Sequence, residues 1–176
     1  MYQAKTIMYL EELLNQLRDD QLPGYGKTPI PGPKDYILME LIDALILVDS
    51  EARSALIKKI GGEYQFSFPG FAERLSSYAV RLNSSDILRR ALLALSLTPG
   101  GDKREILLVC SLVAHSAKKL GVDLRAMLHE HSDFVDEPFK KAVTDFLARP
   151  PEDQSIVAMG YKEGSDSDGF RYVRNW

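Results

Sequence analysis

The sequence predicts an all-α protein, a single-domain bundle of seven or eight helices with a short irregular or β-like C-terminal tail. Apolar residues recur every three or four positions along most of the first 150 residues, which is the spacing of amphipathic helices. Capping residues, glycines and prolines separate these segments, and no run before Pro150 alternates as a strand does. A short HEAT-like helical solenoid is the alternative architecture, although we find no fixed repeat period.

Eight segments carry the helical pattern, at residues 4–19, 34–48, 50–60, 69–82, 85–97, 102–120, 123–131 and 136–147. The apolar stripe of the first is made of Ile7, Met8, Leu10, Leu13, Leu14 and Leu17. A proline-rich connector at 20–34 follows it. Its prolines predict a stiff, extended segment, because each one fixes φ and removes a backbone donor.

Local signals delimit the next helices. The second is apolar on nearly every side, so we expect it to lie centrally. Asp49 or Ser50 caps the third, and Gly61-Gly62 is expected to stop it. Pro69 opens the fourth helix from its first turn, where a missing backbone donor costs nothing.

The later helices are capped in the same way. Ser84, Ser85 or Asp86 caps the fifth, and Asp102 caps the sixth, which is the longest. Gly121 supplies a left-handed residue where the sixth helix ends. Acidic caps also begin the last two, at Asp123 and Asp136.

The tail at 151–176 differs in character from the bundle domain at 1–150. A short helix can begin at Glu152, whereas residues 169–176 alternate polar and apolar side chains. The tail is too apolar to remain exposed to water, because it contains Phe170, Tyr172, Val173 and Trp176. We expect it to pack on the bundle, and a partner protein covering these side chains is the alternative.

Composition excludes several classes of function. The formal charge is −3 and the basic doublets are interleaved with acids, so we expect no nucleic-acid partner. Cys110 is the single cysteine, which rules out an internal disulfide and favours the cytoplasm. The most apolar segment, 36–48, is interrupted by Glu40 and Asp43 and is too short to cross a bilayer, so we expect no membrane partner.

Two nucleotide- and calcium-like motifs fail on spacing. Gly26-Lys27-Thr28 ends like a phosphate-binding loop, but Gln21 stands where that loop needs a glycine. The stretch "EGSDSDGF" resembles part of a calcium loop at Asp166 and Asp168 but lacks the first and last carboxylates, which favours a flexible acidic turn. We expect neither nucleotide nor calcium.

A pocket between helices is the alternative site. Glu40 and Asp43 stand three residues apart and therefore share one side of a helix, where a carboxylate pair can do acid and base chemistry. His115 and His129 are further polar candidates. His129 and His131 point in opposite directions on a helix and cannot share one metal ion there. Such a pocket would make the chain a small-molecule- or metal-binding helical enzyme.

The favoured function is nevertheless binding without catalysis, by a cytoplasmic interaction or regulatory module. Its partner is another protein or a second copy of the chain. We expect no cofactor, no metal and no catalytic residues. The predicted contact residues lie in the connector and the tail, where aromatic and arginine side chains favour interfaces, at Tyr25, Tyr161, Phe170, Arg171, Tyr172, Arg174 and Trp176.

Overall fold

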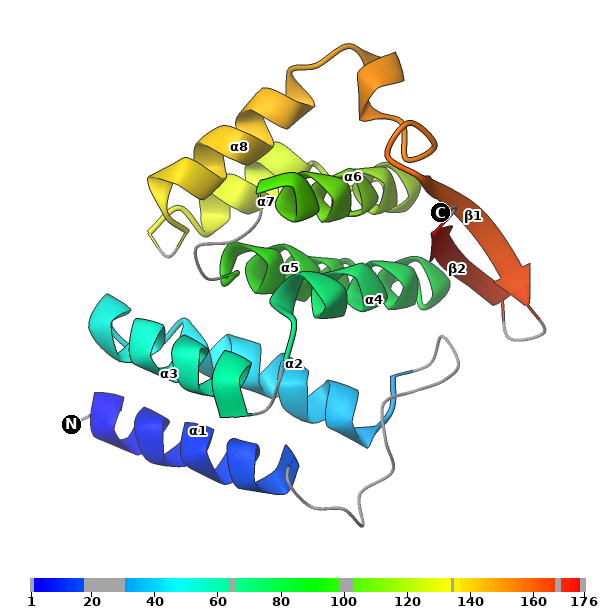
Figure 1. The fold of residues 1–176 in the computed structure, drawn as a ribbon. Helices are drawn as coiled ribbons and strands as arrows, with labels where there is room; N and C mark the ends of the chain where they lie inside the picture. The colour runs from blue at the N-terminus through cyan, green and yellow to red at the C-terminus, as the bar shows by residue number, and fades with distance from the viewer. Residues whose placement is uncertain are drawn as a thin grey trace. The chain divides into compact units, whose positions relative to one another are not determined.

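The structure is a computed structural model that describes residues 2–17, 31–63, 66–98, 103–133, 135–166 and 169–174. These residues form eight α-helices and a C-terminal β-hairpin (Figure 1), which confirms the helical class and the β-like tail. Contacts divide the chain into two compact units, Met1–Phe66 and Ser67–Trp176. The predicted boundary at residue 150 falls inside the second unit.

The first unit contains three helices, α1 (Tyr2–Leu17), α2 (Pro33–Leu45) and α3 (Ser50–Glu63). Helix α1 packs against α2. Their buried apolar side chains follow the predicted spacing and include Leu10, Leu13, Leu14, Leu38, Leu41, Ile42 and Leu45. Burial of these faces, rather than intrinsic propensity, supplies most of the stability of helices this short.

Helix α2 ends earlier than the sequence predicts. It stops at Leu45, and the backbone N–H of Leu47 turns back to the Ala44 carbonyl at 3.0 Å. Arg53 donates to the carbonyls of Leu45 and Val48 at 3.0 and 2.8 Å, so a guanidinium satisfies groups that the end of α2 leaves open.

The predicted stop of α3 at Gly61-Gly62 is wrong, because the helix continues to Glu63. Its start is as predicted, since the Asp49 carboxylate accepts from the Ala52 N–H at 2.8 Å. Glycine in a helix costs only about 1 kcal/mol relative to alanine, which a packed helix tolerates.

The second unit contains the other five helices, α4 (Phe68–Arg81), α5 (Ser85–Ser96), α6 (Lys103–Leu120), α7 (Leu124–Glu130) and α8 (Glu137–Leu147). Helices α4, α5 and α6 pack against one another, and α8 packs on α6. A short 3-10 helix follows at Pro151–Gln154. Side-chain caps at Ser84, Asp123 and Asp136 confirm the predicted helix starts.

The chain closes with a hairpin in which β1 (Tyr161–Asp166) pairs antiparallel with β2 (Gly169–Arg174). The reading of the acidic stretch as a turn is therefore wrong for Glu163 to Asp166, which form most of β1. A strand that is acidic and contains Gly164 gives no apolar alternation to read, so only its pairing with β2 reveals it. Strand β2 packs on α4.

Candidate functional site

A groove on the first unit is formed by one face of α1 and one face of α2. On α1, Lys5, Tyr9 and Glu12 lie at three- or four-residue spacing and so share a face. On α2, Glu40 and Asp43 share a face in the same way. The groove has a volume of about 520 Å³, and its lining is Lys5, Thr6, Tyr9, Glu40, Asp43, Ala44 and Leu47.

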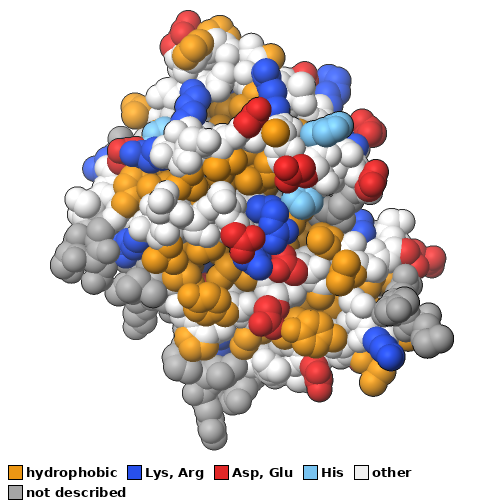
Figure 2. Space-filling model, turned by 180° about the vertical axis from the view of Figure 1, so that it is seen from behind, with side chains coloured by type: hydrophobic (Ala, Val, Ile, Leu, Met, Phe, Trp, Pro, Cys, Tyr) orange, Lys and Arg blue, Asp and Glu red, His pale blue; other side chains and the backbone are white. Residues whose placement is uncertain are grey.

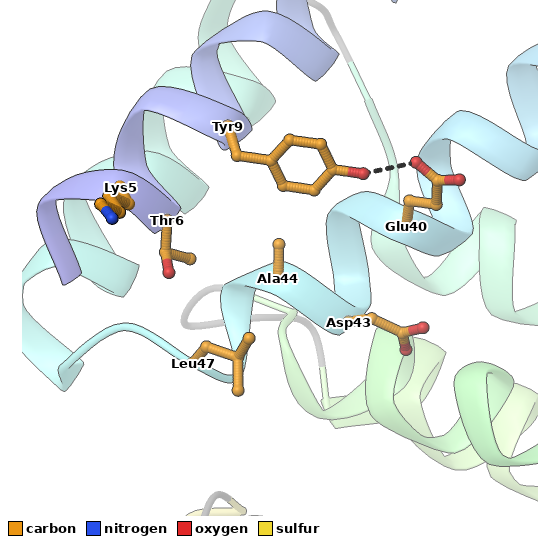
Figure 3. A pocket seen from close by; sticks show the side chains of 7 residues that line it. All are labelled: Lys5, Thr6, Tyr9, Glu40, Asp43, Ala44 and Leu47. Atoms are coloured by element: carbon orange, nitrogen blue, oxygen red, sulfur yellow. Dashed lines mark hydrogen bonds between the residues drawn. The ribbon is translucent and has the colours of Figure 1, made fainter. Parts of the chain in front are cut away.

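One hydrogen bond joins the two walls. The Tyr9 hydroxyl donates to Oε2 of Glu40 at 2.7 Å, and Figure 3 shows the two side chains pointing toward each other from α1 and α2. This bond to a carboxylate raises the pKa of the Tyr9 phenol. Tyr9 therefore remains a protonated donor at neutral pH, and the pair fixes the spacing of α1 and α2 at the groove.

The groove and its rim expose large apolar side chains. Met8 is 68% exposed and Leu47 is 69% exposed, while Tyr9 is 43% exposed. Most large apolar side chains in the described part of the chain are buried, so a cluster of exposed ones around one groove is the arrangement expected of a contact surface. The prediction that Met8 belongs to the buried stripe of its helix is wrong.

The charges of the groove are unbalanced. Among the described residues that line the groove and the adjoining hollow, two exposed carboxylates, Glu12 and Glu40, accompany one base, Lys5. Elsewhere the signs are mixed, and Figure 2 shows acidic and basic side chains interspersed on the face it draws. The groove therefore combines apolar contact area with an excess of negative charge.

The alternative pocket residues fall into separate places. Glu40 and Asp43 both line the α1–α2 groove, as their spacing predicts. His115 lies on α6 in the second unit, and His129 is exposed on α7. The structure therefore gathers two of the four predicted polar groups in one site.

His115 belongs to a chain of hydrogen bonds that holds the hairpin on α6. Its Nδ1 lies 3.0 Å from the Tyr172 hydroxyl, and that hydroxyl also contacts the buried Ser116. On the other side, Nε2 of His115 lies 3.2 Å from Glu163. A neutral imidazole satisfies both contacts of His115 if Tyr172 donates to Nδ1 and Nε2–H donates to Glu163. Ser116 then donates its single proton to Tyr172 rather than to the Ser76 carbonyl, which lies 3.4 Å away.

Burial is the main influence on the pKa values of His115 and Tyr172 in this series of hydrogen bonds. It lowers the pKa of His115 below the ordinary 6.5, and the attraction of Glu163 only partly opposes it. Burial also raises the pKa of Tyr172, so its hydroxyl keeps its proton. Tyr172 therefore remains a protonated donor, and these hydrogen bonds hold the hairpin on α6.

A second polar cluster holds the hairpin on α4. The Tyr161 hydroxyl donates to Oε2 of Glu73 at 3.0 Å, and the Arg174 guanidinium donates to both oxygens of the same carboxylate. Burial, followed by the charge of Glu73, raises the pKa of Tyr161. The apolar sides of Tyr161 and Tyr172 pack with Leu112 and Ile156.

Some of the residues predicted to contact a partner are buried, and others are exposed. Tyr161 is 1% exposed and Tyr172 is 8% exposed, so these rings pack inside the second unit. Arg171 and Arg174 are exposed, and Phe170 is half-buried beside Tyr172. Tyr25 and Trp176 lie outside the described residues, as does the connector from 20 to 30.

Metal and thiol chemistry find little support in the described part of the chain. Within it, no three His, Cys, Asp or Glu side chains are placed to hold a metal ion. Cys110 is buried, and burial raises the pKa of its thiol to about 12. A thiol of this kind is packing material, in agreement with its place on the apolar stripe of α6.

Comparisons with known protein families, with curated proteins and with solved structures found no significant match to this chain. Of the helices in the ranges described above, none is both long enough and apolar enough to span a membrane.

Proposed function

We propose that the chain is a protein-interaction module whose first unit binds a basic amphipathic helix of a partner protein in the α1–α2 groove. The observation that carries this proposal is the cluster of exposed apolar side chains, Met8, Tyr9 and Leu47, around a groove between two helices. Water covers these side chains in the unbound chain. Binding of an apolar partner face displaces this water, which favours association.

The shape of the groove favours a helical partner. Two helices packed side by side form a furrow that accepts a third helix through residues spaced three and four apart. A second hollow on α1, lined by Lys5, Met8, Tyr9 and Glu12, adjoins the groove and shares Lys5 and Tyr9 with it. A helix laid along it would contact several successive turns.

The charge of the groove favours a basic partner. Glu12 and Glu40 are exposed at the rim, and Lys5 is the single base among the lining residues that the structure describes. Complementary charge mainly sets specificity and the rate of association, whereas apolar contact supplies the affinity. Lysine or arginine beside the apolar stripe of the partner helix would complement these carboxylates.

A synthetic amphipathic helix tests the proposal directly. Two peptides of about five turns share one leucine stripe, and their polar face carries either lysine or glutamate. We expect the lysine peptide to bind the purified protein more tightly in a fluorescence anisotropy titration. Leu47→Ser should weaken that binding about tenfold, since it removes most of a buried apolar contact.

Val157→Ser is the matched control, because Val157 is 69% exposed like Leu47 and lies on the second unit outside the groove. It should leave peptide affinity unchanged. Equal binding of both peptides, or an equal loss in the two serine variants, contradicts the proposal. Sedimentation of the protein alone supplies a further test, because self-association that Leu47→Ser abolishes would make a second copy the occupant.

A further inference from the structure

The second unit contains a cavity on α5, α6 and α8, away from the polar clusters that hold the hairpin. It lies where the C-terminal end of α5 and the first turns of α6 face α8, and its volume is about 600 Å³. This volume is within the range of pockets that hold small molecules. The cavity belongs to the second unit, so any function it has is independent of the α1–α2 groove.

The walls of the cavity are largely apolar. Leu95 from α5, Ile106 and Leu107 from α6, and Phe139 and Ala142 from α8 contribute to its lining. Leu95 and Phe139 are buried, whereas Ile106, Leu107 and Ala142 remain partly exposed. The cavity therefore leaves apolar surface of α6 and α8 partly open to a ligand.

Most polar groups of the lining already have partners. The hydroxyls of Ser96 and Thr98 donate to the carbonyls of Leu93 and Leu95 in α5 at 2.6 and 2.8 Å. Asp136 caps α8 by accepting from the Phe139 N–H. Lys141 and Asp145 form an ion pair at 3.1 Å, so their charges offset each other.

Arg149 is the exception. Its guanidinium stands 5.5 Å from the centre of the Phe146 ring, and it forms no ion pair with any acidic side chain among the described residues. Arginine can bind a carboxylate through two parallel hydrogen bonds. The lining therefore offers one exposed guanidinium that forms no ion pair, beside a set of apolar walls, while the Asp136 carboxylate is engaged at the start of α8.

We propose that this cavity binds a small apolar carboxylate, such as a medium-chain fatty acid. Its hydrocarbon part lies against Leu95, Leu107 and Phe139, and its carboxylate accepts hydrogen bonds from Arg149. The apolar walls supply affinity and the guanidinium selects the anion. A neutral alcohol of equal chain length lacks the charge, and a quaternary ammonium carries the wrong sign.

Decanoate, decanol and decyltrimethylammonium are the probes, added to the full chain below their aggregation concentrations and followed by calorimetry and by NMR. We expect decanoate to bind best and to shift the resonances of Leu107 and Ala142. Arg149→Gln should weaken decanoate about tenfold, because a charge-assisted hydrogen bond is lost, while leaving decanol unchanged. Arg125→Gln, an exposed change on α7 outside the cavity, should alter neither.

Ala142→Phe fills the cavity and should reduce the affinity for decanoate and decanol together, with circular dichroism checking that the helices remain. Equal affinity for decanoate and decanol overturns the proposal, as does full decanoate binding by Arg149→Gln. Shifts confined to residues away from α5, α6 and α8 also overturn it. These results are separable from those on the groove, because Leu47→Ser should not affect decanoate.

Discussion

The hydroxyl of Tyr172 on β2 lies 3.0 Å from Nδ1 of His115 on α6, although 57 residues separate them in the chain. The same hydroxyl contacts Ser116, whose side chain is fully buried. One phenol therefore joins the hairpin to two neighbouring residues of α6. Because the site is largely closed to water, solvent cannot replace these contacts cheaply when they are lost.

Removing this hydroxyl should destabilise the second unit. Tyr172→Phe leaves the buried hydroxyl of Ser116 without its phenol partner, and we expect the free energy of unfolding to fall by about 1–2 kcal/mol. Chemical denaturation followed by circular dichroism measures this loss. Tyr36→Phe makes the same chemical change at a ring that is 54% exposed and should cost much less. Equal losses of unfolding free energy in the two variants would show that the hydrogen bonds of Tyr172 contribute nothing specific.

His115 should make stability depend on pH. Its pKa is lower in the folded protein than the ordinary 6.5, chiefly because of burial, so the unfolded chain binds a proton more readily. The contribution of His115 to stability is therefore complete above pH 6.5 and is lost as pH falls toward its lowered folded value.

The test compares the wild-type chain with His115→Gln between pH 7.5 and about pH 5, above the usual carboxyl range. The wild type should lose more stability than the variant on acidification, as measured by urea denaturation at each pH. Because burial also lowers the pKa of His131, some dependence should remain in the variant. Parallel curves for the two proteins would contradict the assignment.

Glu73 should couple β1 to β2 through α4. Glu73→Gln removes the charge that Arg174 contacts and weakens the acceptor of the Tyr161 hydroxyl. We expect a loss of about 1 kcal/mol, since the pair is only partly buried and hence partly screened. A double-mutant cycle with Arg174→Gln isolates the coupling, which should shrink at high salt. A coupling of zero at low salt would mean that the contact is incidental.

Two glycines should respond in opposite directions to alanine. Gly61 lies inside α3 with nothing near the position of an added Cβ, so Gly61→Ala should stabilise the first unit by about 0.5–1 kcal/mol. Gly121 has a φ of +68°, a conformation that disfavours other residues, so Gly121→Ala should destabilise the second unit by about 1 kcal/mol. Thermal denaturation of both variants checks the signs.

The helices could be predicted because their determinants are local. Apolar spacing placed all eight, and cap residues such as Asp49, Asp123 and Asp136 fixed several starts. The end of α3 was placed too early because a glycine inside a helix costs only about 1 kcal/mol relative to alanine and does not by itself end the helix. Strand β1 was missed because its residues acquire strand character through pairing with β2, which no local pattern records.

The sequence predicted the acidic residues that α2 contributes to the groove but not the residues from α1. Glu40 and Asp43 stood out by their spacing, but Tyr9 joins them from another helix, and that pairing depends on how α1 packs against α2. Met8 was assigned to the buried stripe of its helix, because apolar spacing alone does not show which side chains stay exposed. Tyr161 and Tyr172 were predicted to contact a partner because the sequence does not show whether a tyrosine is exposed or is buried with its hydroxyl hydrogen-bonded.

The attachment of the hairpin also bears on the order of events during folding. Helices α4, α5 and α6 are neighbours along the chain and can assemble through contacts of short sequence separation, whereas Tyr161 reaches back 88 residues to Glu73. Closing so long a loop costs entropy before the contact repays it. The hairpin is thus the part of the second unit suited to dock last and to detach first, so that loosening of the C-terminal strands can precede loss of the helices.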